Sequence, residues 1–224
     1  MGSGHFFQGL HDALLALHRS EGIDAPAAHR TILERQLWGA DIDTFAASLA
    51  AIRLFLLDEH ATAATGTLFV HDMLLHSPER PGRELFSAEL LAAEGRERAE
   101  AERAVTLDPG LDDVAPIGEQ RFDAVVGNPP YGARKPEYKR RTYAELYGRT
   151  ERDRRAGSVA TGADDTYGMF FVNGIERLHE GGRLCLITND SFRSLTTYTP
   201  LRRHILDRCK IVEILLTDTG HSRG

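Results

Sequence analysis

The chain has 224 residues, of which 42% are hydrophobic and 27% are charged, the composition of an ordinary soluble globular protein. This length suffices for one full α/β domain with a buried core. No apolar run is long enough to span a bilayer, and the first residues lack the basic stretch of a secretion signal, so we expect a cytoplasmic protein without a membrane partner. The net charge of −6 argues against a protein that coats nucleic acid indiscriminately.

Apolar residues at helical spacing predict two helices at the start of the chain, over residues 6–18 and 26–36. A short buried strand over residues 37–42 is expected next, ending in an acidic turn. Asp43 or Thr44 is expected to cap the helix that follows this turn. The residues expected on the apolar faces of the first helix and of this third helix are Phe6, Leu10, Leu14 and Leu17, and Phe45, Leu49, Ile52 and Leu56.

The rest of the chain alternates between strand-like and helix-like segments, which predicts a doubly wound, mainly parallel α/β sheet with helices on both faces. Gly181 and Gly182 are expected to end a helix, and the apolar run around Cys185 predicts a buried structural thiol. We expect a single domain over residues 1–224. The predicted strands cover residues 67–70, 122–126, 183–188 and 211–216, and the predicted helices cover residues 85–104, 167–179 and 201–208.

Ligands of such sheets bind beyond the carboxyl ends of the strands. Polar residues that end the predicted strands are therefore candidates for a binding site. They are Asp41, Asp72, Asn128, Asn189 and Asp190. The sequence shows no cysteine and histidine spacing typical of a metal site, so no metal is expected.

Asn128-Pro129-Pro130-Tyr131 is the most specific of these features. Neither proline can continue a strand ladder, so the chain must leave the sheet rigidly after Val126. The Asn128 side chain and the Pro129 carbonyl then become adjacent acceptors beside the Tyr131 ring. A delocalised amine becomes more nucleophilic when both its N–H protons are accepted, and the ring can stack on the planar group that carries it. The segment therefore predicts a site for a planar amine; the alternative is a strand-ending turn with a half-buried tyrosine.

Residues 134–155 contain nine basic and four acidic residues, a net charge of +5, so the rest of the chain carries −11. A basic segment of this kind can lie along the phosphates of nucleic acid. The alternative is a solvated loop. The segment falls within an expected insert at about residues 132–160.

Asn-Pro-Pro-Tyr after a hydrophobic strand resembles the motif of amino-group methyltransferases, which modify adenine in DNA, certain RNA bases or a glutamine of release factors. Further stretches resemble that family's motifs, in its order. Residues 2–6 resemble its S-adenosylmethionine loop, residues 38–43 the strand that binds the ribose hydroxyls, residues 68–72 the strand that holds the cofactor adenine, and residues 167–171 the helix that packs on it. The resemblance assigns the cofactor to Gly2, Gly4, Asp41, Ile42, Asp72, Met73, Asn128 and Phe170, and the target to Asn128, Pro129, Pro130 and Tyr131.

Each cofactor assignment has a structural alternative. The two glycines can be ordinary terminal residues, Asp41 a solvated turn acid, Asp72 a strand cap and Phe170 a core residue. Asp43 is interpreted only as a helix cap.

The order of motifs is most similar to large adenine-specific DNA methylases, the type IIG restriction–modification enzymes and the BREX phage-defence methylases. The resemblance implies a Rossmann-like domain that transfers a methyl group from S-adenosylmethionine to the N6 amine of an adenine flipped out of double-stranded DNA, without a metal or a covalent intermediate.

Two parts of the family pattern are missing from residues 1–224. They are the Asp-Pro-Ala that should precede Gly2, and the final sheet strands with a target-recognition domain. We therefore expect an incomplete domain that works with a recognition domain or subunit. The alternatives are a protein-glutamine or RNA methyltransferase, and an inactive DNA-binding remnant.

Overall fold

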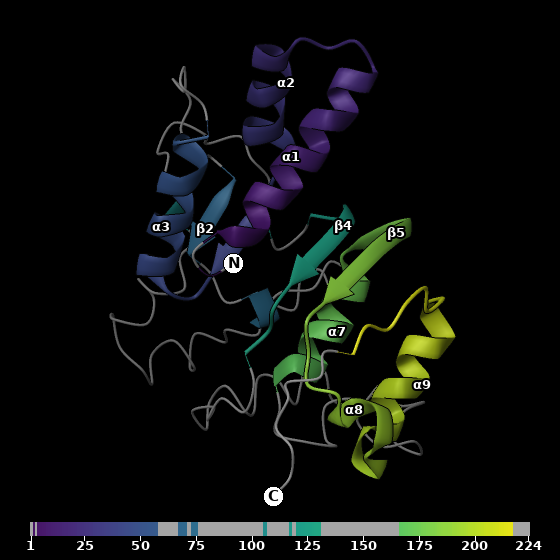
Figure 1. Ribbon diagram of the computed structural model, residues 1–224. Coiled ribbons are helices and arrows are strands. Elements are labelled where there is room, and N and C mark those ends of the chain that lie inside the picture. Colours follow the sequence, from purple (N-terminus) through teal and green to yellow (C-terminus); the bar gives the residue numbers. More distant parts are fainter. Residues whose placement is uncertain are drawn as a thin grey trace, which may run out of the picture.

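The computed structural model describes residues 2, 4–57, 67–70, 73–75, 105–106, 117, 120–130 and 166–216 (Figure 1). Asp72, Tyr131, the predicted helix over residues 85–104 and the basic segment over residues 134–155, with the insert that contains it, lie outside the described residues. No helix among the described residues is both long and apolar enough to cross a membrane.

The described residues of the amino-terminal half include three α-helices: α1 (His5–Ser20), α2 (Ala25–Thr31) and α3 (Thr44–Phe55). The predicted first helix is confirmed. Asp24 starts α2, because its side chain accepts the Ala27 N–H at 2.9 Å and Pro26 occupies the first turn, where no N–H is needed. The predicted second helix continues as a π-helical turn, η1 (Ile32–Gln36), which leads the chain toward the first strand.

The first strands form a three-stranded sheet. β1 (Gly39–Asp41) and β2 (Leu68–Val70) pair in parallel, with Asp41 opposite Val70, so both strands end at the same edge. β3 (Val105–Thr106) joins the other side of β2 in antiparallel orientation. The strand predicted over residues 67–70 is confirmed.

β1 is shorter than the predicted strand over residues 37–42, because the residues on either side of it make local hydrogen bonds with neighbouring helical elements. The Leu37 N–H donates back to the Ile32 carbonyl at 2.9 Å, which keeps that residue with η1. Asp43 already caps α3, as predicted, with its carboxylate accepting the Phe45 N–H at 2.9 Å.

A second, two-stranded sheet comes from the other half of the chain. β4 (Phe122–Gly127) and β5 (Leu178–Leu186) pair in parallel, and α7 (Thr166–Glu176) lies between them in sequence and packs against β5 (Figure 1). This is a β–α–β unit, in which a helix carries the chain back to start a parallel strand. The strand predicted over residues 122–126 is confirmed.

Gly181 and Gly182 do not end α7, as was predicted, but lie inside β5, where it bulges. Between its first two paired positions β5 contains three more residues than β4. Gly181 has a φ of +80°, and a Cβ at Gly182 would come within 2.9 Å of the His179 carbonyl. The helix predicted over residues 167–179 is therefore shorter at its end, because the chain enters β5 at Leu178.

Three short elements follow β5: α8 (Ser191–Ser194), η4 (Thr196–Tyr198) and α9 (Thr199–Arg208). The helix predicted over residues 201–208 is confirmed. The strand predicted over residues 211–216 is wrong, since these residues have no regular secondary structure and Val212 and Leu215 are 77% and 79% exposed. A strand is stable only in a sheet, and none of the described strands pairs with this segment.

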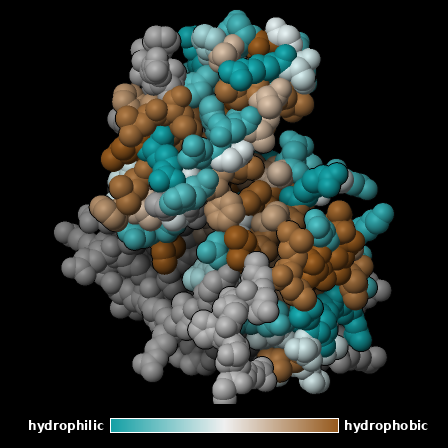
Figure 2. Space-filling view, viewed as in Figure 1, coloured by the Kyte–Doolittle hydropathy of each residue, from teal (hydrophilic) through white to brown (hydrophobic). Residues whose placement is uncertain are grey.

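The buried face of α3 is the reverse of the prediction. Phe45, Leu49, Ile52 and Leu56 are exposed, and Figure 2 shows a hydrophobic surface where α3 lies. The buried residues are Ala47, Ala50 and Leu54, on the side that packs against α1, β1 and β2. The small size of Ala47 and Ala50 allows the helix to pack closely, and Leu54 fills the core beside them.

The buried face of α1 overlaps the predicted one, because Leu10 and Leu14 are partly buried and pack against the core cluster, although the most buried residues differ from the predicted set. Phe7, His11 and His18 are buried, each one position after a residue predicted to be so. His11 turns toward α2, where its Nε2 lies 2.7 Å from Nδ1 of His29. Leu17, which was predicted to be buried, is exposed.

Cys185 is exposed, which contradicts its predicted burial. Side chains alternate between the two faces of a strand. The neighbouring Leu184 contacts Gly174 of α7, so Cys185 points to the face that α7 does not cover.

The described strands and helices form the parallel pairs of an α/β fold, divided between two sheets. Trp38 contacts both of them, with its ring 5.8 Å from that of Phe69 and 6.2 Å from that of Phe122, centroid to centroid. The α/β class therefore agrees with the prediction, while one continuous, doubly wound sheet stays a prediction.

Candidate active site

Asp41 ends β1, and two backbone N–H groups hold its carboxylate. The Gly2 N–H donates to Oδ2 at 2.8 Å and the Asp43 N–H donates to Oδ1 at 3.0 Å. Burial by itself would raise the pKa of Asp41, but the hydrogen bonds from Asp43 and Gly2, together with the charge of the amino terminus, outweigh it and lower the pKa below its ordinary value. Asp41 is therefore an anion at neutral pH.

Gly4 shapes the start of α1 beside this carboxylate. It caps the helix in the left-handed conformation, with a φ of +83°, and is buried. A Cβ at this position would lie 3.0 Å from the Ala50 Cα and 3.2 Å from the Ala50 Cβ. The glycine thus lets α1 begin directly against α3, a structural role that is independent of any cofactor.

The carboxyl end of β2 is brought against α7. Met73, a predicted cofactor residue, is half-buried in the short helix η2 (Met73–Leu75) that follows β2. The next residue, Leu74, is buried in the same core cluster as Tyr167 near the start of α7. Ile42, the corresponding residue after β1, is exposed.

Phe170 lies in the second turn of α7, half-buried, and packs against the cluster that contains Tyr167 and Leu201. These contacts fit the alternative of a core residue. The predicted cofactor contact of Phe170 stays a prediction.

The Asn-Pro-Pro segment leaves the end of β4 between two hydrogen bonds. The Ile187 N–H donates to the Gly127 carbonyl at 3.0 Å, which extends the pairing of β5 to the last residue of β4. The Thr166 hydroxyl donates to the Pro130 carbonyl at 2.9 Å. Asn128 is exposed and Pro129 is buried between these two points. The chain thus leaves the sheet at a fixed place, as the two prolines predict.

The structure brings the predicted residues together in two linked groups. Gly2 and Asp41 are in direct contact, and Asp41 pairs with Val70 at the edge where β2 ends. The segment after β2 contacts α7, which in turn bonds to Pro130. Candidate residues thus come from the carboxyl ends of β1, β2 and β4, where ligands of α/β sheets bind.

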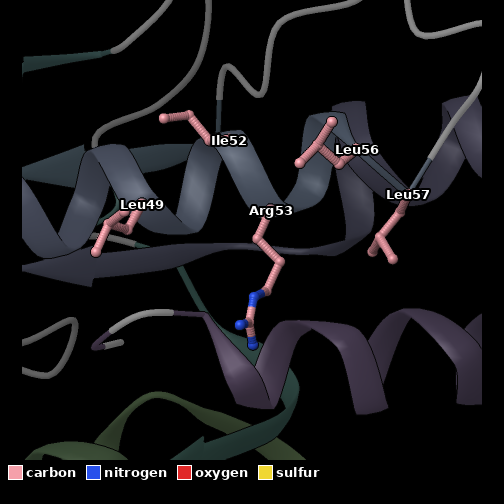
Figure 3. A pocket seen from close by; sticks show the side chains of 5 residues that line it. All are labelled: Leu49, Ile52, Arg53, Leu56 and Leu57. Atoms are coloured by element: carbon pink, nitrogen blue, oxygen red, sulfur yellow. The ribbon is translucent and has the colours of Figure 1, made fainter.

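Sequence reasoning missed two residues near these groups. Thr166 was not singled out, because its bond to Pro130 spans 36 positions and no local pattern indicates it. Arg53 lines a shallow surface hollow of about 350 Å³ with four aliphatic side chains of α3 and the turn after it: Leu49, Ile52, Leu56 and Leu57. In Figure 3 the guanidinium of Arg53 points away from these side chains, toward the start of α1. The hollow holds no acid, base or nucleophile among the described residues that line it.

Among the described residues, no three metal-binding side chains cluster. Burial raises the pKa of the Cys209 thiol, which disfavours its reactive thiolate.

The geometry described above defines an α/β protein with candidate binding residues where parallel strands end. The sequence matches the Eco57I restriction-modification methylase family over residues 35–221, and because this is most of the chain, the chain belongs to that family. It is also similar to the type II methyltransferase M.VspI of Vibrio sp. (strain 343), with 29% identity over 89 residues. Those residues are 39% of this chain and 19% of M.VspI, so the match spans a small part of that relative. The predicted resemblance to restriction–modification methylases is confirmed.

Proposed function

We propose that this chain is the catalytic domain of a DNA methyltransferase that transfers a methyl group from S-adenosylmethionine to the N6 amine of adenine, in restriction–modification or phage defence in the cytoplasm. The observation that carries the proposal is the Asn128-Pro129-Pro130 segment, held at the carboxyl end of β4 between two hydrogen bonds. Membership of the restriction–modification methylase family supports DNA over RNA or protein glutamine as the substrate.

On the target side, the adenine is flipped out of the duplex and stacks on Tyr131. The Asn128 side-chain oxygen and the Pro129 carbonyl accept hydrogen bonds from the two N–H groups of the amine, which localises the lone pair on nitrogen. With the donor bound, the amine would take the sulfonium methyl group, forming an N–C bond as the C–S bond breaks, and would then lose one proton to solvent. Catalysis is chiefly positioning, which can supply a large part of a rate enhancement.

On the donor side, bound S-adenosylmethionine supplies an electrophilic methyl group on its sulfonium. Asp41 fits the ribose of this molecule, because its carboxylate is ionised and held by backbone groups at the end of β1. Gly2 and Gly4 form the loop beside it, with Ile42 adjacent. Asp72 and Met73 take the adenine amine, and Asn128 borders the methyl group. Phe170 packs on the adenine ring.

The partners in this proposal are double-stranded DNA and a recognition domain or subunit that selects the sequence. The basic segment over residues 134–155 contacts the DNA backbone. Its net charge of +5, in a chain of net charge −6, makes it the region most attractive to phosphates.

The test is transfer of labelled methyl groups by the natural full-length protein to duplex DNA, with RNA and release-factor protein offered in parallel. Asn128→Ala should leave S-adenosylmethionine affinity within a few-fold and lower methyl transfer on the order of 10²-fold or more, because one of two acceptors is lost. Asn128→Asp keeps an acceptor oxygen and should lose less.

Two results would contradict the proposal. Label on protein glutamine or RNA and never on DNA adenine would overturn the substrate. Full DNA methylation by Asn128→Ala would overturn the role of the amine acceptors.

A further inference from the structure

Thr166 is the first residue of α7, and its side chain reaches a part of the chain 36 positions away. Its Oγ1 donates a hydrogen bond of 2.9 Å to the Pro130 carbonyl, and the residue is only 5% exposed. Because Thr166 is buried, this carbonyl sets the direction of its hydroxyl, while Pro130 itself is exposed.

The two prolines of the Asn-Pro-Pro segment offer no backbone donor for hydrogen bonds. Pro129 and Pro130 have no N–H to donate, so only their carbonyls can tie this stretch to the rest of the molecule by hydrogen bonds. Their ring-closed φ angles leave the ψ angles as the soft torsions of the segment. The Thr166 bond restrains the Pro130 carbonyl, and with it the ψ angle of Pro130.

α7 is a rigid support for this bond. Tyr167, beside Thr166, is buried in the core cluster with Leu201 of α9. At its other end, the Arg177 carbonyl after α7 accepts the Phe122 N–H at 2.7 Å, where β4 begins. α7 thus holds β4 at its start and the Asn-Pro-Pro segment at its end.

We propose that Thr166 is a positioning residue for the amine acceptors Asn128 and Pro129. This inference rests on the proposed function. Thr166 touches neither substrate nor cofactor, and acts by holding Pro130. Loss of the hydroxyl leaves all amine-binding groups present but lets the segment turn about its ψ angles. Small displacements of reacting groups lower rates strongly, so the chemical step should suffer more than binding of the methyl donor.

The experiment compares Thr166→Val, which keeps the shape without the donor, with Thr166→Ser, which keeps the donor. Thr67→Val is the matched control, because Thr67 is also buried and donates to a backbone carbonyl, that of Leu37 at 2.6 Å, in the other half of the molecule. All are made in the natural full-length protein. Methyl transfer to DNA, KM for S-adenosylmethionine and thermal unfolding are measured for each.

We expect Thr166→Val to lower kcat by about tenfold or more, with KM for S-adenosylmethionine within about twofold. Thr166→Ser should stay within about threefold of the wild-type kcat. Thr67→Val should lose thermal stability without a comparable loss of kcat. A wild-type kcat for Thr166→Val, or an equal loss for Thr67→Val, would overturn the positioning role.

Nuclear magnetic resonance keeps this inference separable from the proposed function. The side-chain amide of Asn128 should shift or broaden in Thr166→Val and not in Thr67→Val. If the wild type methylates no DNA but this spectral change occurs, the proposed function fails and the positioning of Asn128 by Thr166 stands. An unchanged Asn128 signal in Thr166→Val would overturn the positioning itself.

Discussion

At Gly4, the requirements of packing and of the proposed cofactor loop meet in one residue. Its positive φ suits glycine, and the nearby Ala50 leaves no room for a Cβ. The predicted assignment to the cofactor loop would explain the glycine equally well. The two roles are separable, because a packing role affects folding stability even when no cofactor is present.

Gly4→Ala should lower the free energy of unfolding by about 2–4 kcal/mol, the sum of a left-handed conformation and a crowded contact. Gly9→Ala is the control: Gly9 lies inside α1, and a Cβ added there would meet no atom within 4 Å, so alanine should stabilise by about 0.5–1 kcal/mol. Urea unfolding without cofactor measures both. Equal stabilities of Gly4→Ala and wild type would show that α1 does not start against α3.

At the scale of elements, α3 shows why helical periodicity does not identify the inner face by itself. The helix is apolar on two sides, and its periodic stripe of large residues is the outer one. Ala47 and Ala50 form the inner side because their size permits contact with α1 and β2.

Two leucines at the end of this helix test the assignment. Leu54→Ala should lower the free energy of unfolding by about 2–4 kcal/mol, because Leu54 is 1% exposed and its loss leaves a cavity. Leu56→Ala should change it by less than about 0.5 kcal/mol, because Leu56 is 74% exposed. Denaturant unfolding of both variants measures the two losses in the free energy of unfolding. A larger loss for Leu56→Ala than for Leu54→Ala would show that the face expected from the sequence is the buried one.

At the scale of the whole molecule, charge is the property that bears on DNA. The chain is acidic overall, and residues 134–155 carry a concentrated excess of basic residues. If these residues lie along the DNA backbone, binding releases counterions from that one region, and the dependence of affinity on salt reports how many phosphates are neutralised.

Replacing Arg140 and Arg141 by glutamine should weaken DNA binding for all sequences alike. The slope of log affinity against log salt should become shallower by up to about 2, because each phosphate that is no longer neutralised changes it by about 0.9. Arg19 and Arg30, exposed on α1 and α2, provide a control pair with the same loss of charge. Fluorescence anisotropy across a salt series measures the slopes. An unchanged slope, or the same change in the control pair, would support the alternative that the segment is a solvated loop.

The sequence by itself determined those features of the structure that depend on residues close together in the chain. The cap at Asp43 and the exit of the chain at Pro129 depend on interactions within a few positions, and both were predicted. The strands that became β2 and β4 were also predicted, because their apolar runs are local features of the sequence. Membership of a restriction–modification methylase family was also readable, because its motifs are short and ordered along the chain.

Only the tertiary structure decided what depends on distant partners. It placed the outer face of α3 opposite to expectation, turned Gly181 and Gly182 into a bulge, and left residues 211–216 without a strand neighbour among the described strands. It also joined Thr166 to Pro130. Burial, register and a side chain that bonds across 36 positions are set by which surfaces meet in space, and local spacing along the sequence does not specify those meetings.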